Sequence, residues 1–240
     1  MPWKDDNKIW FNPAYVHSCC VEMVQKKGID AIKKEGRLKD LSESYDLAIL
    51  ALIIYELNGK THELPLLQKP KQDPPDGYIG QASKIEKGDF EISVIELTRF
   101  DEQNGKTLLD QLIDSGKIGV EFNKYGKEYI LAVKIEEGLE PNYVEVNQFL
   151  KKAKIPFAVW ALQIIQNSPD TIAKLTILNP EIQIIETNIG RTALQYKLQN
   201  VPNVQEMKRV GSKEKVRKEI GTPLDAKYLN PEFGWIIDQK

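Results

Sequence analysis

The chain has 240 residues, of which 41% are hydrophobic and 28% charged, and its net charge is −2. This length allows a sizeable core, and this charge gives no general attraction to polyanions, so a nucleic acid would have to be held by a local patch. The two cysteines, Cys19 and Cys20, are adjacent, which excludes a disulfide framework and a multi-cysteine metal site and fits a reducing compartment.

Two helices are predicted in the N-terminal part of the chain. Asn12 and Pro13 suit the start of the first helix and Gly28 suits its end. The second is predicted from about residue 42 to 57, capped by Ser42 or Ser44, and its nearly continuous apolar sequence places it in the centre of a core. That run is shorter than the ~20 residues a membrane span needs, and no apolar leader precedes it, so we expect a cytoplasmic protein without membrane association.

The following segments favour strands, interrupted by two helices. Strands are predicted at residues 63–68, 90–100, 118–122, 129–135, 155–165, 171–178, 181–187 and 192–198, with a hairpin joining the third to the fourth. Helices are predicted at 107–115 and 142–154, the latter with a capping box. This order predicts an α/β or α+β fold with a mixed central sheet flanked by helices. We expect one core domain over residues 1–200 and a C-terminal extension over residues 201–240, packed on the core or trailing from it.

Two carboxylates at the predicted strands suggest a metal site. Asp76 lies where a loop enters a strand, and Glu96 and Thr98 share one face of the strand at 90–100 because side chains alternate with period two. If the two strands pair, Asp76 and Glu96 come together at one end of a sheet. Two such carboxylates bind a divalent cation through oxygen, and the cation positions phosphate and activates water. The sequence therefore predicts a divalent-cation site at Asp76 and Glu96 if the two strands pair.

At these residues the sequence resembles the PD-(D/E)xK superfamily of restriction-endonuclease-like nucleases. Pro75-Asp76 matches the first half of its motif and Glu96-Leu97-Thr98 the second, between a buried helix before and a helix after. The resemblance covers roughly residues 42–115, and the motif is short and degenerate. It implies a restriction-endonuclease-like core and a metal-dependent nuclease that hydrolyses DNA phosphodiester bonds, in restriction or defence against mobile DNA.

The resemblance also implies roles for individual residues. Asp76 and Glu96 would hold Mg²⁺ or Mn²⁺, and Thr98 would lie near the attacking water. The metal's ligand shell would be completed by Glu43, Glu56 or Gln111. Nucleases that cut both strands are often homodimers, but the sequence identifies no interface for one.

The motif departs from the family at Thr98, where the family has a lysine that organises the attacking water and the phosphate charge. Threonine supplies a hydroxyl group without a charge, so either another group substitutes or the site is slow or inactive. Arg99 is expected on the opposite face of the strand, and Lys134 is a more distant candidate.

Two other functions remain open. The chain can be a non-catalytic module that binds nucleic acid or protein on the same fold, which the missing lysine favours. It can also be an accessory protein of unrelated α+β fold, such as an immunity or assembly factor, in which case Asp76 and Glu96 lie far apart. Each motif residue has an ordinary interpretation, since Pro-Pro-Asp-Gly is a common turn sequence, threonine suits strands, and Glu96 can face solvent.

Other chemistries have less support. The two histidines, His17 and His62, have no partner at a recognisable spacing, which disfavours a hydrolytic triad and a zinc site. The basic stretch at residues 208–218 contains glutamates, so a solvated, salt-bridged face explains it better than a phosphate-contacting arm.

Overall fold

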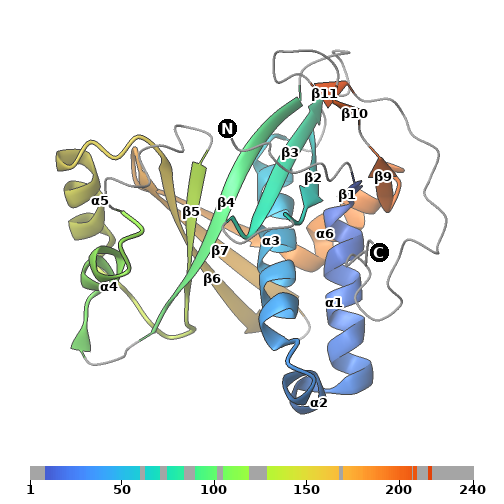
Figure 1. The fold of residues 1–240 in the computed structure, drawn as a ribbon, viewed down its shortest axis with the longest axis horizontal. Helices are drawn as coiled ribbons and strands as arrows, with labels where there is room; N and C mark the ends of the chain where they lie inside the picture. The colour runs from blue at the N-terminus through green and yellow to red at the C-terminus, as the bar shows by residue number, and fades with distance from the viewer. Residues whose placement is uncertain are drawn as a thin grey trace. The chain divides into compact units, whose positions relative to one another are not determined.

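The computed structural model describes residues 9–59, 63–70, 75–83, 90–101, 105–118, 129–167, 170–206, 208–209 and 216–217. They form an α/β fold whose chain divides into two compact units (Figure 1). The described residues of the first unit fall within Gln72–Asp76 and Ser93–Asn188. Those of the second fall within Asp6–Lys71, Gly77–Ile92 and Ile189–Lys240.

The first unit is built on a mixed sheet. Its strands are β4 (Phe90–Phe100, of which the unit holds the part from Ser93), β5 (Tyr129–Ile135), β6 (Ala158–Asn167), β7 (Asp170–Asn179) and β8 (Gln183–Asn188). β4, β5 and β6 are parallel neighbours, whereas β7 and β8 continue the sheet in antiparallel pairing. The prediction of a mixed sheet is thereby confirmed.

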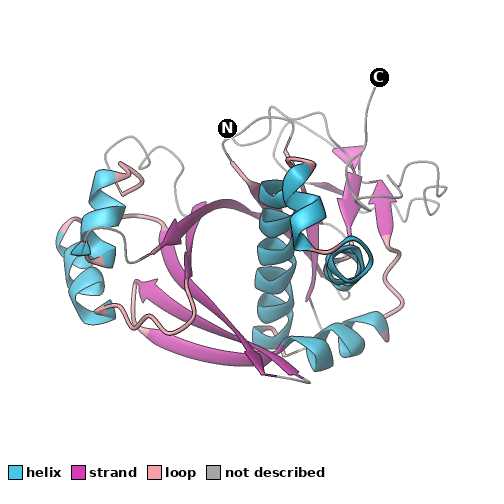
Figure 2. Ribbon diagram, turned by 90° about the horizontal axis from the view of Figure 1, so that it is seen from below, coloured by secondary structure: helices cyan, strands magenta, loops and turns pink. Residues whose placement is uncertain are grey.

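Helices α4 (Leu108–Asp114) and α5 (Tyr143–Lys152) connect the parallel strands of this unit. Parallel neighbours need such crossovers, and successive right-handed crossovers put both helices on one face of the sheet. The two helices lie side by side, and α5 packs against β7 (Figure 2). Thr107 caps α4 in a capping box with Asp110, and Asn142 caps α5 by accepting from the Glu145 amide.

The second unit combines an antiparallel sheet with four helices. Its strands, in the order β3-β2-β1-β9, are β1 (Ile9–Phe11), β2 (Glu63–Gln68), β3 (Gly77–Ser83) and β9 (Val204–Glu206). A separate two-stranded ladder pairs β10 (Lys208–Arg209) with β11 (Val216–Arg217). The helices are α1 (Pro13–Lys27), α2 (Ile29–Lys34), α3 (Leu38–Leu57) and α6 (Ile189–Lys197).

Helix α3 forms the centre of the second unit's core, as predicted. Every residue from Leu47 to Tyr55 is buried, because α1, α6 and β2 all pack against the helix. Its predicted start was wrong, since the helix begins at Leu38. Ser44 does not cap it, because its hydroxyl donates to the Asp40 carbonyl one turn earlier, as serines inside helices do.

The prediction of a strand at residues 192–198 was wrong, because most of this segment belongs to helix α6. Its threonine and tyrosine favour strands, but the buried residues Ile189, Thr192, Ala193 and Tyr196 recur at the helical spacing of three and four. Tyr196 is fully buried and donates to the Pro65 carbonyl at 2.5 Å. Burial against the rest of the unit therefore decides the conformation over local propensity.

Some predictions fall outside the described residues. Residues 119–128 of the predicted hairpin do so, and so do His62 and most of the extension at 201–240. The second strand of that hairpin is β5, whose neighbours on both sides are the parallel strands β4 and β6, so the prediction that β5 pairs in a hairpin is wrong. Among the helices of the described ranges, none is long and apolar enough to cross a membrane.

His17 on α1 gives the second unit a testable pH dependence. It stacks on Tyr45 with ring centroids 5.4 Å apart, and burial, together with nearby Lys197, lowers its pKa from 6.5 to about 4. Between these values the unfolded chain binds a proton that the folded protein excludes, so stability falls as the pH falls. Lowering the pH from 7.5 to 5 should remove about 2 kcal/mol through this residue alone.

Urea unfolding at the two pH values measures this loss. In His17→Phe, which keeps an aromatic ring against Tyr45, the loss should be smaller than in the wild type by about that amount. An equal loss in both proteins would show that His17 is not the group responsible.

Candidate functional site

Asp76 lies against the middle of β4 within the first unit. Its backbone N–H donates to the Ile95 carbonyl at 3.1 Å, and its Oδ2 accepts from the Leu97 N–H at 2.6 Å. These two hydrogen bonds join Asp76 to Ile95 and Leu97, the residues on either side of Glu96. The structure therefore brings Asp76 next to Glu96. The carboxylate takes the place that a backbone carbonyl would occupy in a paired strand.

The residue after Asp76 explains why the chain turns closely here. Gly77 begins β3, and a Cβ atom at this position would lie 2.6 Å from Cδ1 of Leu47, which is itself buried on α3. Only glycine avoids that overlap without a shift of Leu47, so packing favours glycine directly after Asp76.

Glu96 is buried, with 8% of its side chain exposed. It lies in β4 opposite Leu131 of β5 and does not face solvent as one interpretation allowed. A carboxylate in such a place must be paired or bound to a cation. Its Oε1 accepts from Lys117 Nζ at 2.6 Å, and the same ammonium group donates to the Leu97 carbonyl at 3.1 Å.

Lys117 is the residue that the sequence did not single out. It lies in the turn that follows α4, after Gly116, whose φ of 68° suits glycine at a helix end. With 22% of its side chain exposed, it reaches Glu96 from solvent. The structure thus places an ammonium group beside Glu96, two residues before Thr98.

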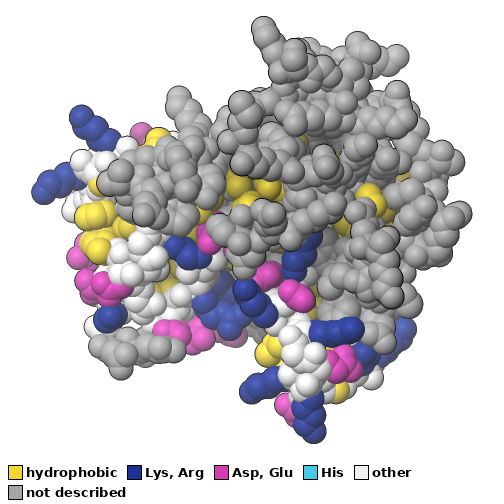
Figure 3. Space-filling view, viewed as in Figure 1, with side chains coloured by type: hydrophobic (Ala, Val, Ile, Leu, Met, Phe, Trp, Pro, Cys, Tyr) yellow, Lys and Arg dark blue, Asp and Glu magenta, His cyan; other side chains and the backbone are white. Residues whose placement is uncertain are grey.

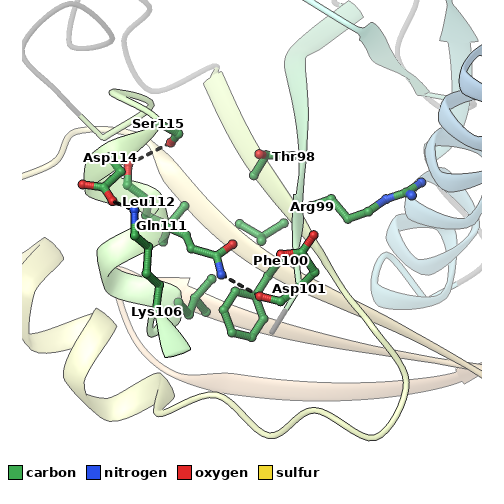
Figure 4. Close-up of a pocket in the computed structure, with 11 residues that line it drawn as sticks. Thr98, Arg99, Phe100, Asp101, Lys106, Gln111, Leu112, Asp114 and Ser115 are labelled. Carbon is green, nitrogen blue, oxygen red and sulfur yellow. Dashed lines mark hydrogen bonds and ion pairs between the residues drawn. The ribbon is translucent and has the colours of Figure 1, made fainter. Parts of the chain in front are cut away.

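The other residues expected near the site have different surroundings. Arg99 is exposed and points away from Thr98, as predicted from the strand's alternation (Figure 4). Gln111 donates from Nε2 to the Asp101 carbonyl at 2.6 Å. Glu43 and Glu56 belong to the second unit, where Glu43 pairs with two lysines and Glu56 accepts from Thr192.

Asp76 and Glu96 suit an Mg²⁺ or Mn²⁺ ion that keeps water molecules among its ligands. They do not suit a metal whose ligands all come from the protein. Asp76 and Glu96 supply two carboxylates from neighbouring segments, and Mg²⁺ is usually held by one or two carboxylates with water and substrate phosphate. No cluster of three or more His, Cys, Asp or Glu residues suited to a metal occurs in the part of the chain that is described. A cation bound here would therefore take its remaining ligands from water and substrate.

A cavity of about 320 Å³ lies in the first unit, and its lining includes Thr98 and Ser115, which are two residues away in sequence from Glu96 and Lys117. It begins at Thr98 on β4 and is closed by α4, with Val133 of β5 in its lining (Figure 4). On the face of the molecule shown in Figure 3, the described basic and acidic side chains are intermixed.

No protein-family model, curated protein or solved structure matches this chain. The interpretation of the site therefore rests on its residues and their geometry.

Proposed function

We propose that the protein is a metal-dependent nuclease that hydrolyses DNA phosphodiester bonds at Asp76, Glu96 and Lys117. The observation that supports it most is the Lys117 ammonium at 2.6 Å from Glu96, since Asp76 lies beside the same glutamate. Two carboxylates and one ammonium group are suited to binding a cation and a phosphate together. The restriction-endonuclease-like core is part of this proposal.

Each residue has a defined part in the reaction. Asp76 and Glu96 hold the cation, which when bound supplies a Lewis acid for the phosphoryl oxygen and lowers the pKa of water. Lys117 neutralises the negative charge that grows on the phosphate oxygens, and the Thr98 hydroxyl orients the attacking water. Water adds to phosphorus and loses a proton to solvent, while the bond to the leaving sugar oxygen breaks and that oxygen takes up a proton.

A cleavage assay tests the proposal. Supercoiled plasmid and single-stranded DNA are incubated with the protein and Mg²⁺, Mn²⁺ or a chelator. Cutting should require the metal, and Glu96→Gln should lose it by about 100-fold or more, because a neutral amide is a poor ligand for a hard cation. Glu145→Gln, at an exposed position on α5, is the matched control and should cut normally. Cutting that survives both the chelator and Glu96→Gln would contradict the proposal.

A non-catalytic nucleic-acid- or protein-binding module on this fold is the second candidate. The observation that favours it is that both carboxylates already have protein partners, Leu97 for Asp76 and Lys117 for Glu96. Such a site can be purely structural. Isothermal titration with Mg²⁺ and Mn²⁺ separates the two candidates, because only the nuclease should bind the cation and lose that binding in Glu96→Gln.

A further inference from the structure

The cavity beside Thr98 has an apolar floor and a polar rim. Phe100 of β4, Val133 of β5, and Leu108 and Leu112 of α4 are buried and line it. Thr98, Gln111 and Ser115 add polar groups to the lining. A volume of about 320 Å³ is within the range of sites for small organic ligands, and a lining of four apolar and seven polar or charged residues suits a ligand that has both apolar and polar parts.

The charges around the cavity indicate a neutral ligand. Two basic residues, Arg99 and Lys106, and two acidic residues, Asp101 and Asp114, belong to the lining. Lys106 and Asp114 pair with each other at 2.7 Å, and both are about half exposed. Because Lys106 is paired with Asp114 and the Arg99 side chain points away from Thr98, neither basic residue of the lining is directed at a phosphate in the cavity, which suits an uncharged group better (Figure 4).

We infer that this cavity binds a nucleobase of the strand whose phosphate lies at Glu96, an inference that rests on the proposed function. Thr98 follows Glu96 on the same face of β4, about 7 Å further along the strand. A phosphate at Glu96 therefore has its own base, or that of the adjacent nucleotide, within reach of the cavity. A base has flat apolar faces for the floor and a polar edge for the rim.

Gln111 is the residue best placed to recognise the edge of the base. Its Nε2 donates to the Asp101 carbonyl at 2.6 Å, which fixes the amide over the cavity (Figure 4). Its Oε1 has no hydrogen-bond partner among the described residues and can accept from the exocyclic amino group of adenine, cytosine or guanine. Because a paired base lies inside the stack, this site requires single-stranded DNA or an extruded base.

Binding of small probes tests the inference without relying on cleavage. Calorimetry or NMR compares deoxyadenosine 5′-monophosphate with 2-deoxyribose 5-phosphate, which carries the same phosphate but no base. The nucleotide should bind at least about 10-fold more tightly, since stacking and edge contacts contribute on that scale. Gln111→Trp, whose larger side chain fills the cavity, should abolish this preference. The matched control Gln148→Trp, at an exposed position on α5, should retain it.

Either of two results would overturn the inference: equal affinity of the wild type for both probes, or an unchanged preference in Gln111→Trp. Metal-dependent cleavage of single-stranded DNA is measured on the same proteins. If the wild type cuts and Gln111→Trp cuts with an unchanged KM, the base site is wrong and the nuclease remains. If the wild type does not cut but shows the Gln111-dependent preference, the base site holds and the nuclease proposal is wrong.

Discussion

Asp76→Asn is expected to lower metal-dependent cleavage by about 100-fold or more while leaving the fold intact, a loss of about 2.7 kcal/mol in transition-state stabilisation. In the wild type the Leu97 N–H donates to Asp76 Oδ2 at 2.6 Å. Asparagine keeps a side-chain oxygen at this position, so the hydrogen bond to β4 is retained. It removes the negative charge that a divalent cation requires. Initial cleavage rates at saturating Mg²⁺, together with urea unfolding, measure both effects.

Comparison with Asp76→Ala separates the contribution of Asp76 to stability from its contribution to cleavage. Alanine also removes the acceptor of the Leu97 N–H, which should cost about 1–3 kcal/mol of unfolding free energy that Asp76→Asn retains. Asp170→Asn, at an exposed position at the start of β7, is the matched control and should change neither quantity. Wild-type cleavage by Asp76→Asn would show that Asp76 only fixes the strand.

The sequence predicted best those elements in which local preference and burial agree. β4 combines β-branched and aromatic residues with clear alternation, and its bounds, Phe90–Phe100, are those expected. Helix α1 has Asn12 and Gly28 at its ends, which specify a start and a stop. In α6, Thr192 and Tyr196 individually favour strands, but the buried residues of this segment are spaced as on one face of a helix. The segment is helical because this face packs in the core.

The candidate site shows the same division between local and non-local information. Glu96 and Thr98 could be placed on one face from strand alternation alone, and Asp76 from the Pro-Asp-Gly turn before β3. Lys117 could not, because its contact with Glu96 depends on how the chain returns after β4. From Glu96 to the end of β4 the chain advances about 13 Å, and the seven residues of α4 lead back about 10 Å. Only the crossover between parallel strands brings the turn after α4 near Glu96.

Lys117→Met is expected to lower kcat by about 100-fold or more with little change in KM, because the charge that the ammonium group neutralises grows in the transition state. Methionine keeps the length and apolar character of the stem, so the change removes mainly the charge. Lys151→Met, at an exposed position on α5, is the matched control and should retain wild-type rates. Single-turnover cleavage of DNA at saturating Mg²⁺ measures the effect on the chemical step.

A purely structural lysine would produce a different set of results. Lys117→Met leaves the buried Glu96 without its ammonium partner, so the metal-free variant should lose about 2 kcal/mol of stability. Adding Glu96→Gln removes the charge that Lys117 no longer neutralises and should restore much of that stability, and cleavage should stay absent in the double variant. If Lys117→Met is destabilised yet cleaves at the wild-type rate, Lys117 serves only to neutralise Glu96 and the catalytic group that replaces the motif lysine lies elsewhere.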